Sequence, residues 1–170
     1  MTSIGSSAFY NCSSLSSITI PNNVTSIGGY AFSGCSSLSS IHIPKSVTSI
    51  GNSAFSSGNL TSITVNEDNP NYKSENNMLL SKDGKTLVAG VNGDVVIPEG
   101  VTSIGNYAFN GCSSLSSITI PSGVTSIGTY AFNSCRSLSN ITCNRTSAPT
   151  VKSSTFGTST GSYTGQNTYD

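Results

Sequence analysis

The chain has 170 residues and no net charge, and only 8% of its residues are charged. A nucleic-acid-binding protein needs a basic surface, and this sequence contains no basic cluster. No apolar run approaches the roughly 20 residues of a membrane-spanning helix. We therefore expect neither a nucleic-acid partner nor a membrane span, but a single domain long enough to bury a continuous core.

A repeat of 23 residues runs along most of the chain. It reads Ile-Gly-x-x-Ala-Phe-x-x-Cys-x-x-Leu-x-x-Ile-x-Ile-Pro. Its phenylalanines mark five copies, at Phe9, Phe32, Phe55, Phe109 and Phe132. A period of this length is typical of solenoids, in which each repeat forms one coil and neighbouring coils share a core. Met1 falls inside a repeat, so we expect the sequence to belong to a longer protein.

Each coil contains two short extended segments. In Ser17-Ile18-Thr19-Ile20 the isoleucines face one side and the hydroxyl groups face the other, as in a half-buried strand. Pro21 ends this first strand, and residues 24–27 form a second extended segment. Residues 30–35 are then expected to form a helical or 3₁₀ turn. Read in this way, the chain predicts a parallel ladder of six first strands, at 18–20, 41–43, 63–65, 95–97, 118–120 and 141–143.

One coil is longer than the others, because the first strands at 63–65 and 95–97 begin 32 residues apart instead of 22 or 23. Its apolar runs 78–80 and 86–89 flank Lys82-Asp83-Gly84-Lys85, which predicts a β-hairpin. Nine of the fourteen charged residues lie between Glu67 and Glu99. Two interpretations stay open: the charged hairpin is a binding protrusion, or it only completes the stack.

No pattern in the sequence indicates catalysis or a cofactor. The single histidine, His42, stands at an outward position where other coils carry threonine, and the equivalent positions of the neighbouring strands offer serine and threonine but no carboxylate partner. Residues 67–71 lack the ligand spacing of a calcium loop. Four cysteines share one repeat position, and their separation does not match a zinc site. We expect buried free thiols, with disulfides between stacked neighbours as the alternative. The thiols concerned are Cys12, Cys35, Cys112 and Cys135, together with Cys143.

The repeat resembles the BspA-like subclass of leucine-rich repeats, with the unit L-x-x-I-x-I-P-x-x-V-x-x-I-G-x-x-A-F-x-x-C, over residues 1 to about 143. The expected fold is an α/β solenoid dominated by β structure, with about six coils, a parallel strand ladder, short helical or 3₁₀ turns and one β-hairpin insertion. The predicted division is a solenoid over 1–143 with a longer variant coil at 64–95, a C-terminal cap over 144–157, and a Ser/Thr/Gly-rich tail over 158–170.

The resemblance also implies a function: a non-enzymatic protein-binding or adhesion module of a bacterial cell-surface or secreted protein. Its implied partners are proteins, among them host matrix proteins, or glycans. The alternative is a structural spacer without its own ligand. We expect a monomer, or end-to-end association through the open terminal coil.

Two surfaces are candidates for partner binding. The first, here called the strand face, is the outer side of the first strands: Ser17, Thr19, Ser40, His42, Ser62, Thr64 and Thr119. The second, here called the charged loop, consists of Lys82, Asp83 and Lys85. Tyr30, Tyr107 and Tyr130 also recur at one repeat position, either as an aromatic stripe for a partner or as a cover for the edge of the core.

Overall fold

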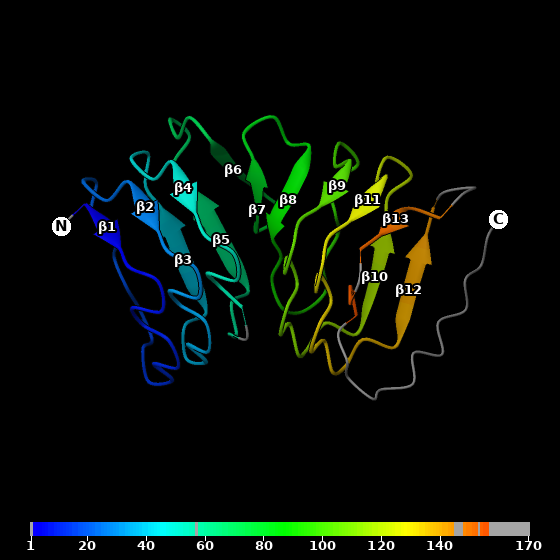
Figure 1. Cartoon of the computed structure of the whole chain (residues 1–170), viewed down its shortest axis with the longest axis horizontal. Coiled ribbons are helices and arrows are strands. Elements are labelled where there is room, and N and C mark those ends of the chain that lie inside the picture. Colours follow the sequence, from blue (N-terminus) through cyan, green and yellow to red (C-terminus); the bar gives the residue numbers. More distant parts are fainter. Residues whose placement is uncertain (1, 57, 145–147, 153, 157–170) are drawn as a thin grey trace.

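The computed structural model describes residues 2–56, 58–144, 148–152 and 154–156. The tail predicted over 158–170 lies outside the described residues. The described part forms a solenoid, which confirms the predicted fold class, and its coils lie side by side from the N-terminal to the C-terminal end (Figure 1). No helix occurs among these residues, and therefore none that could cross a membrane.

Short strands supply the regular structure of the described residues. They are β1 (Ser3–Ile4), β2 (Ser26–Ile27), β3 (Ser40–Ile43), β4 (Ser49–Ile50), β5 (Ser62–Val65), β6 (Tyr72–Glu75), β7 (Met78–Ser81), β8 (Thr86–Ala89), β9 (Ser103–Ile104), β10 (Ser117–Ile120), β11 (Ser126–Ile127), β12 (Asn140–Cys143) and β13 (Thr150–Val151). They form four sheets, with the orders β1-β2-β4, β3-β5, β10-β12 and β13-β11-β9-β8-β7-β6.

The predicted ladder of six first strands is wrong for two coils. β3 pairs with β5 and β10 pairs with β12, both in parallel, but residues 18–20 and 95–97 are not strands. The side chains of these two segments nevertheless point in the predicted directions, because Ile20 and Ile97 are buried. Residues 95–97 have the turn between β6 and β7 as their neighbour, where a regular coil would have a first strand. There the side-chain amide of Asn76 donates to the carbonyl of Val96 at 2.9 Å.

The corner that follows each second strand is a series of β-turns, and not the predicted helical or 3₁₀ turn. In corner 28–35 the N–H groups of Ala31, Ser33 and Cys35 donate to the carbonyl three residues earlier. The intervening N–H groups of Tyr30 and Phe32 donate instead to the next coil. A 3₁₀ helix uses successive N–H groups for its own i→i−3 bonds, so this alternation excludes it. The corners therefore form their own backbone ladder along the stack.

Stacked phenyl rings run through the core beneath the corners. Their centroids lie 5.2 Å apart for Phe9–Phe32, 6.0 Å for Phe32–Phe55, 5.2 Å for Phe109–Phe132 and 5.8 Å for Phe132–Phe156. Among the described residues no stacked pair joins Phe55 to Phe109. The column of rings is thus divided in two at the variant coil.

The variant coil contains three antiparallel strands where one hairpin was predicted. The hairpin of β7 and β8 is confirmed, but β6, which pairs with β7, was not predicted. Asn76 and Asn77 join β6 to β7 with φ values of 51° and 62°, as a tight hairpin turn requires. β5 lies beside β6 and β7, and β8 pairs in parallel with β9. The insertion therefore connects the N-terminal ladders to the C-terminal ones (Figure 1).

Candidate functional site

The strand face is solvent-exposed, as its alternating pattern predicts. Thr19, His42 and Thr64 are all exposed, and His42 and Thr64 are direct neighbours in the parallel register of β3 and β5. The Nδ1 atom of His42 lies 3.0 Å from the Oγ1 atom of Thr64, and the tautomer of His42 decides which of them donates. His42 therefore belongs to a row of hydroxyl groups, which offers hydrogen bonds but no acid–base pair.

The turn between β6 and β7 divides the strand face into two halves. The Oγ atom of Ser62 donates to Oδ1 of Asn77 at 3.3 Å, and the N–H of Ile63 donates to the carbonyl of Asn77 at 2.8 Å. Thr119 lies beyond this turn, on β10. The structure thus brings six of the seven predicted residues together in an N-terminal half: Ser17, Thr19, Ser40, His42, Ser62 and Thr64.

The charged loop does not join the strand face, because it lies at the opposite end of β7 from Asn77 (Figure 1). Oδ1 of Asp83 accepts from the Ser81 hydroxyl at 2.6 Å and from the N–H of Lys85 at 2.9 Å. These two bonds hold the pKa of the Asp83 carboxyl below its usual range. Nζ of Lys82 donates to the carbonyl of Glu67 at 2.7 Å. The charges of Lys82 and Asp83 thus help to shape the turn.

Two buried asparagines, which the sequence analysis did not single out as structural, fix the variant coil. Asn69 is fully buried, and its amide donates to the carbonyls of Pro44 at 2.9 Å and Val47 at 2.8 Å. Its Oδ1 accepts from the N–H groups of Asn71 and Tyr72. Each polar atom of this side chain is therefore already used in the fold. The sequence gives little indication that these two asparagines are buried, because asparagine also occurs in many of the exposed turns.

Asn92 connects the other side of the variant coil. Its amide donates to the carbonyl of Gly58 at 2.8 Å, and its Oδ1 accepts from the hydroxyl of Ser114 at 2.9 Å. The N–H of Asn92 also donates to the carbonyl of Leu60 at 2.8 Å. A single residue thus bridges the coil before the insertion and the coil after it.

All five thiols are free, and their burial differs from the prediction at two positions. Cys12 is exposed, because its corner is the first in the chain and is covered by a neighbouring coil on one side only, and Cys143 is half-buried. Burial raises the pKa of Cys112 and also raises that of Cys135, to about 12. The Sγ atom of Cys135 lies 3.0 Å from the carbonyl oxygen of Phe109, to which it donates. In the described part of the chain no group of three His, Cys, Asp or Glu side chains could hold a metal ion.

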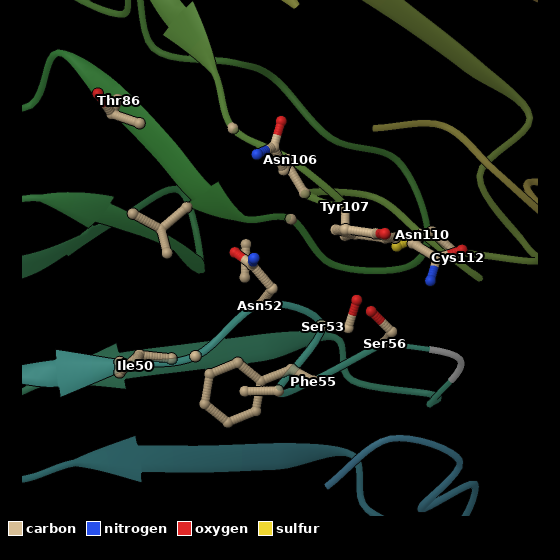
Figure 2. A pocket seen from close by; sticks show the side chains of 17 residues that line it. Ile50, Asn52, Ser53, Phe55, Ser56, Thr86, Asn106, Tyr107, Asn110 and Cys112 are labelled. Atoms are coloured by element: carbon tan, nitrogen blue, oxygen red, sulfur yellow. The ribbon is translucent and has the colours of Figure 1, made fainter. Parts of the chain in front are cut away.

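A cavity of about 150 Å³ opens between the corners 51–56 and 105–112 (Figure 2). Its walls include Ser53, Phe55 and Ser56 on one side and Tyr107 and Asn110 on the other. Thr86 and the residues 88–90 of the variant coil complete its lining. We call this cavity the corner slot. The slot was not predicted from the sequence, although the Ala-Phe pair that is missing after residues 86–89 indicates that one corner is absent.

The tyrosines of the corners lie near this slot. Tyr107 and Tyr130 stack with their ring centroids 5.3 Å apart, and Tyr30 is 43% exposed. Burial, together with the neighbouring phenols of Tyr30 and Tyr130, raises the pKa of Tyr107. These rings therefore form a partly exposed aromatic surface, and not only a cover for the core.

Stacked single-layer coils, short parallel strands and a column of core phenyl rings define a solenoid of the leucine-rich-repeat class. The family model for the BspA type leucine rich repeat region matches six copies, over residues 2–80 and 92–164, and the chain belongs to this family. Repeats of this class are generally non-catalytic and generally serve in protein interactions. No curated protein matches the chain.

Solved structures of bacterial proteins share the fold. The crystal structure of the pneumococcal vaccine antigen PcpA is similar over 85% of this chain and 38% of that chain, with 29% identity and a TM-score of 0.75. A leucine rich cell surface protein from Faecalibacterium prausnitzii A2-165 is similar over 83% of this chain and 38% of that chain, with 38% identity and a TM-score of 0.70. A leucine-rich repeat protein from Bacteroides ovatus ATCC 8483 shares the fold at 23% identity and a TM-score of 0.51, over 89% of this chain and 43% of that chain. The chain thus spans less than half the length of each.

Proposed function

We propose that the chain is a non-enzymatic protein-binding module of a cell-surface or secreted protein, and that the N-terminal half of the strand face contacts the partner. The observation that carries this proposal is the exposed row around His42 and Thr64 on adjacent strands, which contains no Asp, Glu, Lys or Arg. A cell surface protein and a vaccine antigen among the similar structures support the placement outside the cell. Adhesion to host matrix proteins or glycans is the corresponding role.

The strand face suits protein contact for a physical reason. Neighbouring strands repeat about every 4.8 Å, so their hydroxyl groups form a regular array of donors and acceptors. Threonine has a stiff side chain, because its β-branched carbon restricts χ1. Thr19 and Thr64 therefore lose little conformational entropy when a partner orders them. Because this row carries no permanent charge, binding should depend only weakly on ionic strength.

The domain division and the mode of association are part of the same proposal. β13 pairs with β11 and Phe156 stacks on Phe132, which supports a cap within 144–157. At the other end a hollow lined by Ile4, Phe9 and Val24 opens beside the first corner. A monomer, or end-to-end contact through this hollow, fits these two different ends.

The test is capture of the protein by a panel of immobilised extracellular matrix proteins and glycans. Exchanging Thr19, His42 and Thr64 together for lysine should abolish capture and leave the melting temperature close to that of the wild type. The matched control places three lysines at the exposed positions Ser117, Thr119 and Asn140 on β10 and β12 and should retain capture. Capture that survives the first triple change refutes the strand face as the site. If the wild-type protein is captured by no member of the panel, the spacer role is favoured.

The charged loop is tested separately by the double exchange Lys82→Gln and Lys85→Gln. Removing the whole hairpin is unsuitable, because Met78, Leu79 and Leu80 of β7 are fully buried. The double exchange should leave capture unchanged. Loss of capture in this variant alone would move the site to the charged loop.

A further inference from the structure

The variant coil lacks the corner that every other coil forms. In a regular coil the second strand is followed by a corner of eight residues, such as 28–35 after β2. In the variant coil, Gly90 follows β8 directly and its N–H donates to the carbonyl of Ala108 at 2.7 Å. The N–H groups of Phe9, Phe32 and Phe109 make the equivalent bond to an alanine carbonyl of the next coil. Gly90 thus occupies the phenylalanine position, and most of one corner is missing from the ladder.

The missing corner leaves backbone groups unpaired on both walls of the corner slot. Elsewhere, the N–H groups of Tyr107 and Phe109 donate to the next coil at 3.0 and 2.7 Å. The equivalent N–H groups of Ser53 and Phe55 have no acceptor within the described residues. On the opposite wall the N–H of Gly105 donates to the carbonyl of Leu87 at 2.8 Å, and among the carbonyls of this wall only that of Ala108 accepts a bond from the variant coil.

The carbonyls on that opposite wall complete the pattern. Gly29 and Ser33 accept through their carbonyls from the preceding coil, at 2.9 and 2.8 Å. The equivalent carbonyls of Asn106 and Asn110 accept no bond from the described residues. One wall therefore presents two free N–H groups, and the other presents two free carbonyls.

A buried hydroxyl group adds independent evidence for a ligand. Ser53 is only 7% exposed, and its Oγ has no hydrogen-bond partner; it is the one such buried side-chain atom in the described part of the chain. An unsatisfied buried polar atom costs about 1–3 kcal/mol, so native structures rarely keep one without a reason. Figure 2 shows the hydroxyl groups of Ser53 and Ser56 between their own wall and the side chain of Asn110.

The size and lining of the slot indicate the kind of ligand. Coils repeat about every 4.8 Å, so two corners separated by one missing corner leave room for a single polypeptide strand. No charged residue lines the cavity of about 150 Å³. A Cβ atom at Gly90 would clash with the ring of Phe109, which already fills the space beneath the slot. The ligand must therefore be uncharged and small where it faces that ring.

We propose that the corner slot binds a short, uncharged, extended segment of a partner polypeptide, which takes the place of the missing corner. Carbonyl oxygens of the segment accept from the N–H groups of Ser53 and Phe55, and an N–H group of the segment donates to the carbonyl of Asn106 or to that of Asn110, while Gly90 keeps its bond to the carbonyl of Ala108 between them. Main-chain bonds of this kind give affinity in strand-addition complexes, and the neighbouring side chains give specificity. This site is separate from the strand face and goes beyond the proposed function, which does not depend on it.

The experiment selects binders from a phage-displayed library of random heptapeptides on the wild-type protein, with counter-selection on the variant Ser53→Tyr. Tyrosine fits this backbone position, because Tyr30 and Tyr107 adopt φ values of 57° and 58° there and Ser53 adopts 58°. Its ring should obstruct the slot while the fold is kept. The matched control is Ser7→Tyr, at the equivalent but exposed position of the first corner, with φ of 58°.

The expected result is a family of uncharged peptides that bind the wild type and Ser7→Tyr and lose at least tenfold in affinity on Ser53→Tyr. In hydrogen exchange, the best peptide should protect the amides of Ser53 and Phe55. Without peptide, these two amides should exchange faster than those of Tyr107 and Phe109. The proposal is overturned if no peptide distinguishes the two variants, or if bound peptides leave both amides unprotected. Protection by mono- or disaccharides and not by peptides would overturn it in favour of a glycan site.

Discussion

The regular coils and the variant coil solve the same packing problem in different ways. In the regular coils the backbone itself joins neighbours, as when the N–H of Phe32 donates to the carbonyl of Ala54 at 2.8 Å. In the variant coil, side-chain amides of Asn69 and Asn92 replace much of this ladder. The regular coils thus leave little unsatisfied, whereas the variant coil leaves polar groups open. Backbone groups that a second partner could bind are accordingly found where the repeat is interrupted, in addition to the side chains of the strand face.

The largest expected effect concerns the column of phenyl rings. Phe132→Ala removes a ring that is fully buried between Phe109 and Phe156, and should lower the free energy of unfolding by about 4 kcal/mol. Phe55→Ala should cost clearly less, because Phe55 stacks on Phe32 and lines the corner slot on its other side. Chemical denaturation measures both. Equal losses would show that the slot does not weaken packing there.

Asn69 should be the next most sensitive position. Asn69→Ala leaves the buried carbonyls of Pro44 and Val47 without their donor and should cost about 3 kcal/mol. Asn71→Ala is the matched control, because the Asn71 amide donates to a single exposed carbonyl, that of Thr48. It should cost less than about 1 kcal/mol in the same denaturation experiment. A small effect of Asn69→Ala would contradict the role of this side chain in holding the variant coil.

Alkaline pH should weaken the regular coils through their thiols. The raised pKa values of Cys112 and Cys135 favour the neutral thiol in the folded state, so the stabilisation is complete below pH 9 and is lost as pH rises toward about 12. At pH 10 each thiol should lower the free energy of unfolding by about 1.4 kcal/mol relative to pH 8. In denaturation at both pH values, the double exchange of Cys112 and Cys135 for alanine should show a smaller alkaline loss. An alkaline loss in this double variant as large as that of the wild type would contradict the role of the two thiols.

The smallest effect is expected inside the slot. Ser53→Ala removes a buried hydroxyl that has no partner, so the free energy of unfolding should change by less than about 0.5 kcal/mol or rise slightly. Ser7→Ala, at the same backbone conformation in solvent, is the reference. Thermal melting of the two variants gives the comparison. A loss above 1 kcal/mol for Ser53→Ala alone would mean that the hydroxyl already has a partner within the fold.

Periodicity alone predicts most of the solenoid, because each coil repeats the inward facing of Ile, Leu, Val and Phe. The burial of Ile20 and Ile97 follows even where no strand forms. The corners were predicted less well. Local sequence at 30–35 does not show that alternate N–H groups bond to another coil, so a 3₁₀ turn and a series of β-turns look alike.

The variant coil was only partly predictable, because its contacts join residues from different coils. The turn at Asn76 and Asn77 has the residue type of a hairpin turn, yet β6 before it lacks a clear apolar alternation. The corner slot depends on Gly90 standing at a phenylalanine position, which becomes visible only when the carbonyl of Ala108 identifies its place in the ladder. The strand face was predicted from the alternation of apolar and hydroxyl side chains. Its division by Asn77 became visible only in the structure.

The alternation of bonds in the corners has an electrostatic consequence. The peptide groups whose N–H belongs to Tyr30, Phe32 and Gly34 all point along the stack toward the C-terminal end, so their dipoles add as they do in a helix. The corner slot interrupts this row of dipoles, with N–H groups on its N-terminal wall and carbonyls on its C-terminal wall. A local field therefore crosses the slot in a fixed direction. Peptide groups bound there should align with that field, with their carbonyls toward Ser53 and Phe55 and their N–H groups toward Asn106 and Asn110.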